Sequence, residues 1–499
     1  MDVRYIAVLE IGSSKVKGAV ARTDGDGVAT IVAAHEVKTI DCVRHGRVQN
    51  VQEVAERVDE VLRRLENDPA VAPRRLRRVR IALGGRSLAS VSASTQATLP
   101  AEVQITDDIV ERLKKDVVLG LPADKQVVDV LPRGFNVDGA GMTKVVGTYG
   151  RNIHADMTVL LVSPDNRTNL ERVRMTSDEN QLERIYVPRQ LALARMALTP
   201  SEQQLGVVLV DFGAETTTVS IHRDGVLQSL VTLPMGGRNI TRDIAAGLTI
   251  TEEQAEYIKC AQAAAMPDNT TDGESQEARE INSYSQARAG EIIANVLHRI
   301  EQAGFKASEL TAGIVLTGRA AQMRRMAELF ETQTRMRVRV APADNSVRPG
   351  RTDLDPIDAL DIMSLIAWPV ATQDSDLTEL PAAPAVAENV YEEPEDEYRG
   401  YDTRRMADGA RARRDEDLDD SNVLNDDPDD PDFEDLRSKK KTKRNKKREQ
   451  EPDYDNETGE DDGDDNGDDN GGRFGGLRSF MSKFTHAIIG TQGPQDIDD

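Results

Sequence analysis

Two stretches of the chain, about two hundred residues apart, repeat one order of apolar and polar positions. Residues 8–20 and 207–221 each contain an apolar run, a carboxylate, a glycine, small hydroxyl residues and a second apolar run. The carboxylates are Glu10 and Asp211. Because the glycine permits a tight turn between two strands, each stretch predicts a β-hairpin.

The turns of these hairpins carry groups that suit a phosphate. Exposed backbone N–H groups beside Ser or Thr hydroxyls form an anion cradle, and a carboxylate at a strand end can hold the water shell of a metal ion. A single turn of this kind is usually only a turn, and its carboxylate only a strand-end cap. Two of them, one in each half of the chain, indicate two related lobes that clasp one phosphate chain.

A third stretch extends the pattern. Residues 313–318 predict a buried strand that ends in Gly318, and Arg319 opens a predicted helix. Junctions of strand, glycine and helix often contact a nucleotide phosphate or ribose. Such junctions are also common in α/β proteins that bind nothing there, so this stretch is informative only together with the two hairpins.

In this order the three stretches resemble the phosphate-1, phosphate-2 and adenosine motifs of the actin/Hsp70-like ATPase superfamily. Within it, the chain resembles the FtsA family of bacterial cell-division proteins over roughly residues 3–373 and again at the last helix. The segments that carry the resemblance are 9–16, 81–85, 236–245, 255–259 and 312–318. The resemblance implies an α/β fold, namely an actin-like two-lobed ATPase fold with an FtsA-type inserted subdomain, a long disordered acidic linker and a C-terminal amphipathic helix.

The resemblance also implies that ATP and Mg²⁺ bind between the lobes. Glu10 and Asp211 would hold Mg²⁺ through water, and the other cofactor-binding residues would be Gly12, Ser13, Ser14, Lys15, Gly213, Thr216, Thr217, Gly237, Glu256, Lys259, Gly318 and Arg319. Simpler readings stay open for three of them. Lys15 is also typical of a solvated hairpin tip, and Glu256 with Lys259 is typical of a surface pair one helical turn apart. No catalytic residue is assigned.

Two positions depart from the family pattern in this site. Ala214 and Glu215 stand where the family has a glycine-rich turn, and Arg319 stands where it has a second glycine. Glu215 brings a negative charge near the phosphates, so we expect weak or no ATPase activity. Attraction between Glu215 and Arg319 would offset this charge and could hold the cleft shut without nucleotide.

The spacing of apolar residues changes along the chain, and these changes predict where its domains begin and end. Lobe 1 is expected at residues 1–78, 166–205 and 342–373, the inserted subdomain at 79–165, and lobe 2 at 206–341. The predicted helices are 51–65, 106–119, 165–178, 240–246, 251–264, 288–303 and 355–368, with a polar, mobile stretch at 266–280.

Cys42 and Cys260 lack metal-site spacing and fit a reduced cytosol. We find neither a signal peptide nor a run of about 18 apolar residues.

Apolar content collapses near residue 370, and residues 374–472 predict a disordered linker. They hold 35 Asp and Glu against 15 Lys and Arg, so −20 of the total charge of −24 lies here. The preceding residues are close to neutral, which argues against nucleic acid as the main partner. A basic block at residues 439–448 either neutralises the surrounding acids or is attracted to anionic lipid.

Residues 473–490 return to a helical period. Their apolar residues recur at steps of three or four and form one face, made of Phe474, Leu477, Phe480, Met481, Phe484 and Ile488. The segment is too short to span a bilayer and carries cations on its other faces, which is typical of a helix lying in the membrane interface. The alternative is a helix that packs on the protein itself. Residues 491–499 form a tail.

By resemblance, the chain is expected to anchor polymers of FtsZ, the tubulin-like division protein, to the cytoplasmic face of the cell membrane at the division site. Arg288, Glu291 and Ile292 resemble a family pattern on the helix that receives the C-terminal peptide of FtsZ, although Arg288 also fits an ordinary surface arginine. The expected partners are this peptide, further copies of the chain in a polymer, an anionic membrane surface and other division proteins. Two alternatives remain: an actin-fold enzyme such as a sugar kinase or an active ATPase, and a PilM-like pilus assembly scaffold.

Overall fold

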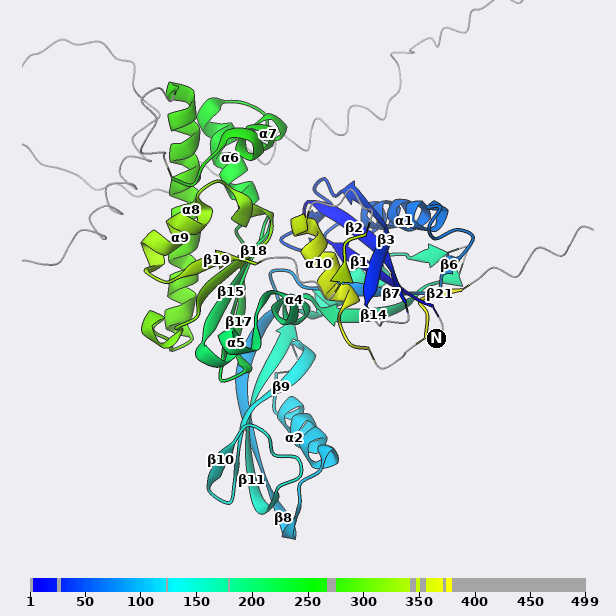
Figure 1. The fold of residues 1–499 in the computed structure, drawn as a ribbon, viewed down its shortest axis with the longest axis vertical. Coiled ribbons are helices and arrows are strands. Elements are labelled where there is room, and N and C mark those ends of the chain that lie inside the picture. Colours follow the sequence, from blue (N-terminus) through cyan, green and yellow to red (C-terminus); the bar gives the residue numbers. More distant parts are fainter. Residues whose placement is uncertain are drawn as a thin grey trace, which may run out of the picture. The chain divides into compact units, whose positions relative to one another are not determined.

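The computed structural model describes residues 3–378 apart from 25–27, 123, 178–179, 267–274, 342–346, 351–355 and 371–373. Two large sheets with their helices make up this part of the chain (Figure 1). Among its helices, none has the length and apolar character needed to cross a membrane. The terminal helix predicted at 473–490, the tail and most of the predicted linker lie outside the described residues.

The first sheet forms the core of lobe 1. Its six strands lie in the order β14-β7-β1-β2-β3-β20. Their bounds are β1 Arg4–Ile11, β2 Lys15–Thr23, β3 Ala29–Lys38, β7 Arg78–Leu83, β14 Glu183–Pro188 and β20 Val347–Arg348. Helix α1 (Val51–Asn67) packs its apolar side on one face, while α4 (Arg189–Ala197) and α10 (Pro356–Ile366) cover the other. Burial on both faces explains why β1 is almost continuously apolar and why the middle of β2 is buried throughout.

The second sheet joins the inserted subdomain to lobe 2. Its nine strands lie in the order β10-β9-β11-β8-β17-β16-β15-β18-β19. Their bounds are β8 Ala89–Gln104, β9 Gln126–Val137, β10 Ala140–Met142, β11 Tyr149–Val162, β15 Val207–Phe212, β16 Thr217–Arg223, β17 Val226–Leu233, β18 Gly313–Thr317 and β19 Val338–Val340. Strands β8 to β11 carry the insertion, and one antiparallel pair, Val231 with Ala89, links β17 to β8.

Helices complete each part. Helix α2 (Asp107–Leu119) packs in the core of the insertion. The helices of lobe 2 are α6 (Gly237–Leu248), α7 (Glu252–Gln262), α8 (Gln276–Gln302) and α9 (Met326–Thr334). The shorter elements are β4 Val43–Arg44, β5 Arg47–Val48, β6 Arg75–Leu76, α3 Pro164–Arg172, β12 Thr176–Ser177, β13 Asn180–Gln181, α5 Pro200–Leu205, η1 Ala307–Glu309, η2 Arg319–Gln322 and β21 Leu377–Thr378.

Several predicted boundaries differ from the structure. Strand β7 pairs with β1 and β14 in lobe 1, so the insertion begins after Leu83 rather than at residue 79. The helix predicted at 165–178 ends at Arg172, because the chain then enters β12. Helix α8 starts at Gln276, within the stretch predicted to be mobile. The segment after Gly318 is a short 3₁₀ turn rather than an α-helix.

The predicted linker also begins too early, because its first residues belong to the fold. Asp376 is only 1% exposed. Its carboxylate accepts hydrogen bonds from Arg78 Nε at 2.7 Å and from the Ala7 backbone N–H at 3.1 Å. Strand β21 then pairs with β6. The residues up to Thr378 are therefore attached to β1 and β7, where the acidic composition alone predicted disorder.

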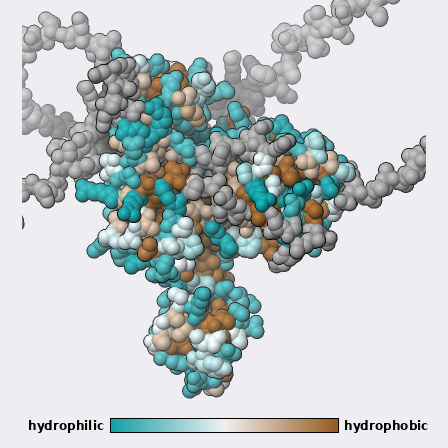
Figure 2. Space-filling view, in the orientation of Figure 1, coloured by the Kyte–Doolittle hydropathy of each residue, from teal (hydrophilic) through white to brown (hydrophobic). Residues whose placement is uncertain are grey.

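The inserted subdomain exposes several large apolar side chains. Figure 2 shows apolar residues among hydrophilic ones on its surface. They include Val91, Val103, Val118, Leu119, Val146 and Tyr149, of which Leu119 is 84% exposed and Tyr149 64%.

Candidate functional site

The two predicted hairpins are present and have the same turn. The Gly12 N–H donates to the Lys15 carbonyl at 2.9 Å between β1 and β2, and the Gly213 N–H donates to the Thr216 carbonyl at 2.9 Å between β15 and β16. Both turns line a cavity of about 110 Å³ between the lobes. The walls include the predicted residues Glu10, Gly12, Ser13, Asp211, Gly213 and Thr216, together with Glu215. The cleft thus brings together the residues that sequence spacing had paired.

A charged cluster fills one end of this cleft. Arg189, the first residue of α4, donates to three carboxylates at once. Its Nε lies 3.0 Å from Glu10 Oε1, its Nη2 lies 2.7 Å from Asp361 Oδ1, and its Nη1 donates to Asp211 Oδ2. Lys17 adds a second cation, with Nζ 3.0 Å from Glu10 Oε2 and 3.2 Å from Asp361 Oδ2.

The carboxylates of this cluster differ in their proton affinity. Burial raises the pKa of Asp361 to about 6, and the neighbouring Glu10 charge adds to that effect against the attraction of Arg189. Burial also acts to raise the pKa of Glu10, but Lys17 and Arg189 outweigh it and lower that pKa to about 2. Three carboxylates share two cations, so one negative charge is in excess. Of Glu10 and Asp361, it is Asp361 that more readily takes the proton that removes this excess.

Glu215 forms a second bridge between the lobes. Its carboxylate accepts from the His45 backbone N–H at 2.6 Å and from Arg238 Nη1 at 2.8 Å. The Arg238 guanidinium also donates to the Ser13 carbonyl at 3.2 Å, and Arg242 lies 3.8 Å from Glu215. Sequence analysis expected Arg319 as the partner of Glu215. Arg238 and Arg242 already supply the positive charge that this partner was meant to provide.

The residues predicted for the adenosine side lie around the start of α6. Lys259 Nζ donates to the Gly237 carbonyl at 3.2 Å and to Glu256 Oε2 at 2.6 Å, and Thr241 donates to the same Glu256 carboxylate. A β-carbon at Gly318 would lie 2.5 Å from the Phe212 carbonyl oxygen, so only glycine fits where β18 ends beside β15. Arg319 is exposed in η2.

Some predicted phosphate-binding residues make other contacts. Lys15 pairs with Glu36 on β3 at 2.5 Å, and Ser14 is exposed. Thr217 is fully buried, and its hydroxyl donates to the Met235 carbonyl at 2.8 Å. Ser13 accepts the Gly46 N–H at 2.8 Å through its hydroxyl oxygen. These hydroxyl groups therefore fix the loops of the cleft to one another in the structure.

Sequence analysis missed Arg189, Lys17 and Asp361. Two of them are charged residues within largely apolar segments: Arg189 opens an apolar helix, and Asp361 lies within the apolar run 359–368. Lys17 has no such signal, because β2 also contains Lys15 and Arg22. A lone charge in such a segment has to find a partner inside the fold. That signal could have identified Arg189 and Asp361 as buried charges, but it could not have shown that they contact each other.

The arranged residues do not fit Mg²⁺. This ion keeps most of its water and binds through carboxylate oxygens that face it, whereas Glu10 and Asp211 each accept an Arg189 N–H. Asp211 Oδ1 is buried without a hydrogen-bond partner, but Arg189 occupies the other oxygen of the same carboxylate. No group of three His, Cys, Asp or Glu side chains within the described residues has the arrangement of a metal site. Arg189 supplies the cation that joins these carboxylates.

The cleft is also too small for a nucleotide in this arrangement. Its volume of about 110 Å³ compares with roughly 300–1,000 Å³ for sites that bury a small molecule. The first N–H groups of α6 are engaged as well, since Gly237 donates to the Gly213 carbonyl at 3.0 Å and Arg238 to the Ala214 carbonyl at 2.7 Å. A nucleotide would need the lobes to separate.

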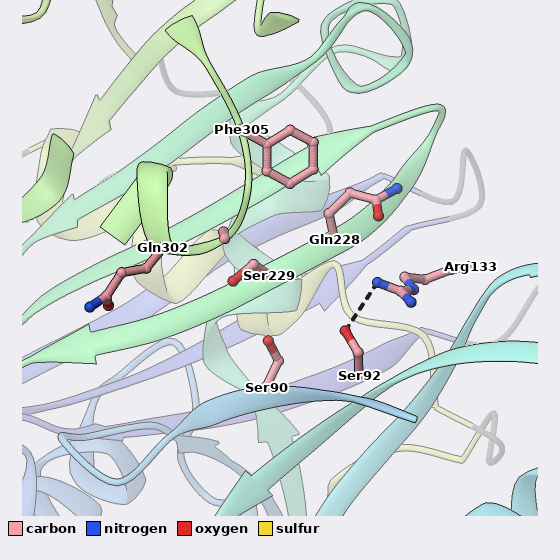
Figure 3. Close-up of a pocket in the computed structure, with 8 residues that line it drawn as sticks. Ser90, Ser92, Arg133, Gln228, Ser229, Gln302 and Phe305 are labelled. Carbon is pink, nitrogen blue, oxygen red and sulfur yellow. Dashed lines mark hydrogen bonds between the residues drawn. The ribbon is translucent and has the colours of Figure 1, made fainter. Parts of the chain in front are cut away.

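A second, larger cavity lies where the insertion meets lobe 2. It measures about 310 Å³ and is lined by Ser90, Ser92, Arg133, Gln228, Ser229, Gln302, Ala303 and Phe305. Figure 3 shows that two of these lining residues contact each other, with Arg133 donating to the Ser92 hydroxyl. The distance between the two atoms is 3.1 Å. The cavity arises because β8 and β17 diverge after their single pair, and the Ser90 hydroxyl accepts the Leu230 N–H in place of a backbone partner.

Comparison with known proteins identifies the family. The sequence model of the family described as "Cell division protein FtsA" matches residues 208–355, and that of the "SHS2 domain inserted in FTSA" matches residues 85–161. The second match coincides with the insertion that begins after β7. The two matches thus cover the inserted subdomain and most of lobe 2, which includes the second hairpin.

Individual proteins agree with this assignment. "Cell division protein FtsA" of Porphyromonas gingivalis is 29% identical over 328 residues, covering 62% of this chain and 67% of that protein. The protein of the same name from Neisseria meningitidis serogroup B is 26% identical over 347 residues, covering 66% and 81%. Among solved structures, a "PilM-PilN type IV pilus biogenesis complex" aligns with 72% of this chain and 97% of its own, at a TM-score of 0.51 and 15% identity.

The structural likeness concerns the fold alone. It confirms the predicted actin-like two-lobed fold, and the match at 85–161 confirms the FtsA-type insertion. The curated relatives carry the assignment of the family, since they align over 328 and 347 residues. This chain belongs to the FtsA family of bacterial cell-division proteins.

Proposed function

We propose that this protein anchors FtsZ polymers to the cytoplasmic face of the cell membrane at the division site, polymerises with further copies of itself, and binds ATP in the cleft between its lobes. The observation that carries the proposal is its membership of the FtsA family, which the matches to the FtsA model and to the model of its inserted domain support. Each part of the function rests on a different region of the chain and has its own test.

The membrane contact belongs to the C-terminal segment. Residues 473–490 carry one apolar helical face with cations elsewhere, which suits a helix that lies in the interface between lipid and water. The predicted linker separates this segment from the fold, and the basic block at 439–448 adds attraction to anionic lipid. The protein would therefore be a peripheral membrane protein that is tethered at a distance from its lobes.

The surface around Arg288 is the proposed site for the FtsZ peptide. The Arg288 guanidinium lies between α8 and α6 and donates to both Asp243 oxygens, at 2.5 and 2.9 Å, and to Glu291. Ile292 is fully buried in the core of lobe 2, so the prediction that it contacts a partner needs correction. Arg288 and Glu291 remain as candidates, and a carboxylate of the peptide would compete with Asp243 for the guanidinium.

Replacing Arg288 with glutamate should weaken binding of an acidic FtsZ tail peptide at least about tenfold, because it removes a charge-assisted bond and adds repulsion. Fluorescence anisotropy with a labelled peptide measures the affinity. Arg299→Glu makes the same charge change three turns further along α8 and should leave it unaltered. Vesicle binding should be normal in both variants. Peptide affinity equal to that of the wild type in Arg288→Glu would refute the role.

Self-assembly is proposed to use the inserted subdomain. Its exposed apolar side chains, among them Leu119 and Tyr149, offer area that burial against a second copy would stabilise. ATP would bind in the cleft after the lobes separate, with weak or no hydrolysis, and without the Mg²⁺ arrangement expected from the family pattern. Recruitment of other division proteins completes the proposal.

One experiment separates this function from its alternatives. Sedimentation with anionic vesicles, with and without FtsZ tail peptide and ATP, should recover both protein and peptide in the vesicle fraction. An actin-fold enzyme would turn over ATP or a sugar without any need for vesicles. A PilM-like scaffold, which shares the fold, would not carry FtsZ peptide to the membrane.

A further inference from the structure

Glu215 occupies an anion site that is built from both lobes. Its carboxylate is 3% exposed and receives the His45 backbone N–H at 2.6 Å and Arg238 Nη1 at 2.8 Å. Arg242 adds positive charge at 3.8 Å. A backbone N–H combined with guanidinium groups is the chemistry by which proteins hold phosphate and carboxylate alike.

The lobe 1 side of this site is rigid. His45 and Gly46 lie between β4 and β5, and a β-carbon at Gly46 would come within 2.6 Å of Gly85 Cα, where β7 ends. The Gly46 N–H donates to Ser13 Oγ at 2.8 Å, and the Arg86 N–H donates to the His45 carbonyl at 2.9 Å. The His45 N–H is therefore held in place whether or not Glu215 accepts from it.

The lobe 2 side connects back across the cleft. Arg238 donates to Glu215 with Nη1 and to the Ser13 carbonyl of the first hairpin with Nη2, at 3.2 Å. This site and the cation cluster belong to one cleft, since Glu215 and Arg189 both line it. In that cluster, Arg189 joins Glu10 and Asp361 of lobe 1 to Asp211 of lobe 2.

We propose that Glu215 is an internal anion that takes the place of a nucleotide phosphate, as Arg189 takes the place of its cation, so that the lobes close without nucleotide. This inference rests on the proposed ATP binding, because it takes ATP as the ligand whose phosphate competes with the Glu215 carboxylate. A nucleotide has to displace Glu215 from Arg238 and from the His45 N–H before its own phosphate can use them. Glu215 thus sets how tightly this cleft binds phosphate.

Two consequences distinguish this arrangement from a surface salt bridge. Removing the Glu215 carboxylate should free the bridge between the lobes, so the His45 amide should exchange its hydrogen faster without nucleotide. The same change leaves Arg238, Arg242 and the His45 N–H without their anion, so ATP should bind about tenfold more tightly or better. Removing a carboxylate that lies in the cleft without joining the lobes would have neither effect.

The test compares the full-length wild type with Glu215→Ala and Glu215→Gln. Glu252→Gln is the matched control, because Glu252 also pairs with Arg242, at 3.3 Å, but is exposed on α7. Hydrogen exchange of the peptide around His45 is measured without nucleotide, and the ATP dissociation constant is measured by calorimetry with Mg²⁺ and with EDTA. We expect faster exchange and tighter ATP binding in both Glu215 variants, with no change in Glu252→Gln and little difference between Mg²⁺ and EDTA for the wild type.

The outcomes separate the inference from the function on which it rests. Unchanged exchange at His45 in Glu215→Ala overturns the proposal, whatever ATP does. Wild-type ATP binding as tight as that of Glu215→Ala overturns it too. Faster exchange in the variants, with no ATP binding by any of the proteins, supports the internal bridge and instead refutes nucleotide binding as part of the proposed function.

Discussion

Replacing both Phe480 and Phe484 with glutamate should abolish sedimentation of this protein with anionic vesicles. The two rings belong to the apolar face of residues 473–490. Full burial of one such ring is worth roughly 1.5–3 kcal/mol, and burial in the membrane interface somewhat less. Two glutamates remove both contributions and place carboxylates at the depth of the lipid headgroups. Because the predicted apolar face has six side chains, the loss of two should reduce binding below detection.

The control is a pair of substitutions that keeps the apolar face. Ser479→Glu with Ser482→Glu adds the same two charges on the opposite side of the helix. On zwitterionic vesicles, where net charge matters little, this control should sediment as the wild type does. Undiminished binding by the double phenylalanine variant, or equal loss in both pairs, would contradict a role of the apolar face.

Local patterns predicted the hairpins because their cause is local. The carboxylate, glycine and hydroxyl residues that mark each turn all lie within a few positions, and the Gly12 and Gly213 bonds form inside the same segments. Helix α1 could be predicted for the same reason, since its apolar residues recur at helical spacing from Val54 to Leu65. The order of these elements carried the resemblance to a family and hence the fold.

The predictions that were wrong concern segments whose structure depends on contacts between residues far apart in the sequence. The first three turns of α8 are polar in sequence, yet Asn282 is buried there because its side chain accepts the Ala264 N–H at 2.7 Å. Asp376 seemed part of an acidic linker until Arg78 and the Ala7 N–H were found beside it. Both pairs of residues are far apart in the sequence, so a local pattern of apolar and polar positions cannot reveal them.

The charged cluster around Arg189 shows the same limit most clearly. Arg189 and Asp361 lie 172 positions apart, and neither stands in a motif that sequence analysis used. A charged residue in an apolar segment indicates a buried partner without identifying it. The predicted magnesium ligands were located correctly at the ends of β1 and β15, but the cation beside them is a side chain of the protein.

Replacing Arg189 with alanine should destabilise the fold by about 3–5 kcal/mol at neutral pH, the usual cost of removing one partner from a buried ionic cluster. Glu10, Asp211 and Asp361 have side chains no more than 11% exposed, and the variant would leave them with Lys17 as their remaining cation in the cluster. Urea unfolding followed by circular dichroism measures the loss. Arg195→Ala, an exposed position on the same helix, should cost far less.

The pH dependence gives this prediction its sharper form. In the wild type, the pKa of Glu10 is lowered from 4.5 to about 2, so its contribution to stability is present above pH 4.5 and is lost as the pH falls through about 2. The pKa of Asp361 is raised from 3.8 to about 6, so its contribution is present below pH 3.8 and is lost as the pH rises through about 6. The cluster should therefore stabilise the fold most near pH 4, between the ordinary pKa values of Asp361 (3.8) and Glu10 (4.5), and less as the pH rises from there to about 6.

Removing Arg189 strengthens the repulsion among the carboxylates and raises their affinity for protons. The Arg189→Ala variant should accordingly lose more stability at pH 8, where Glu10 and Asp361 are both ionised, than at pH 5, where a proton on Asp361 can replace the missing cation. Arg189→Lys keeps one charge but cannot reach three carboxylates with one planar group, so its loss should lie between those of Arg189→Ala and the wild type. A loss that is the same at both pH values would mean that Arg189 acts through packing rather than through its charge.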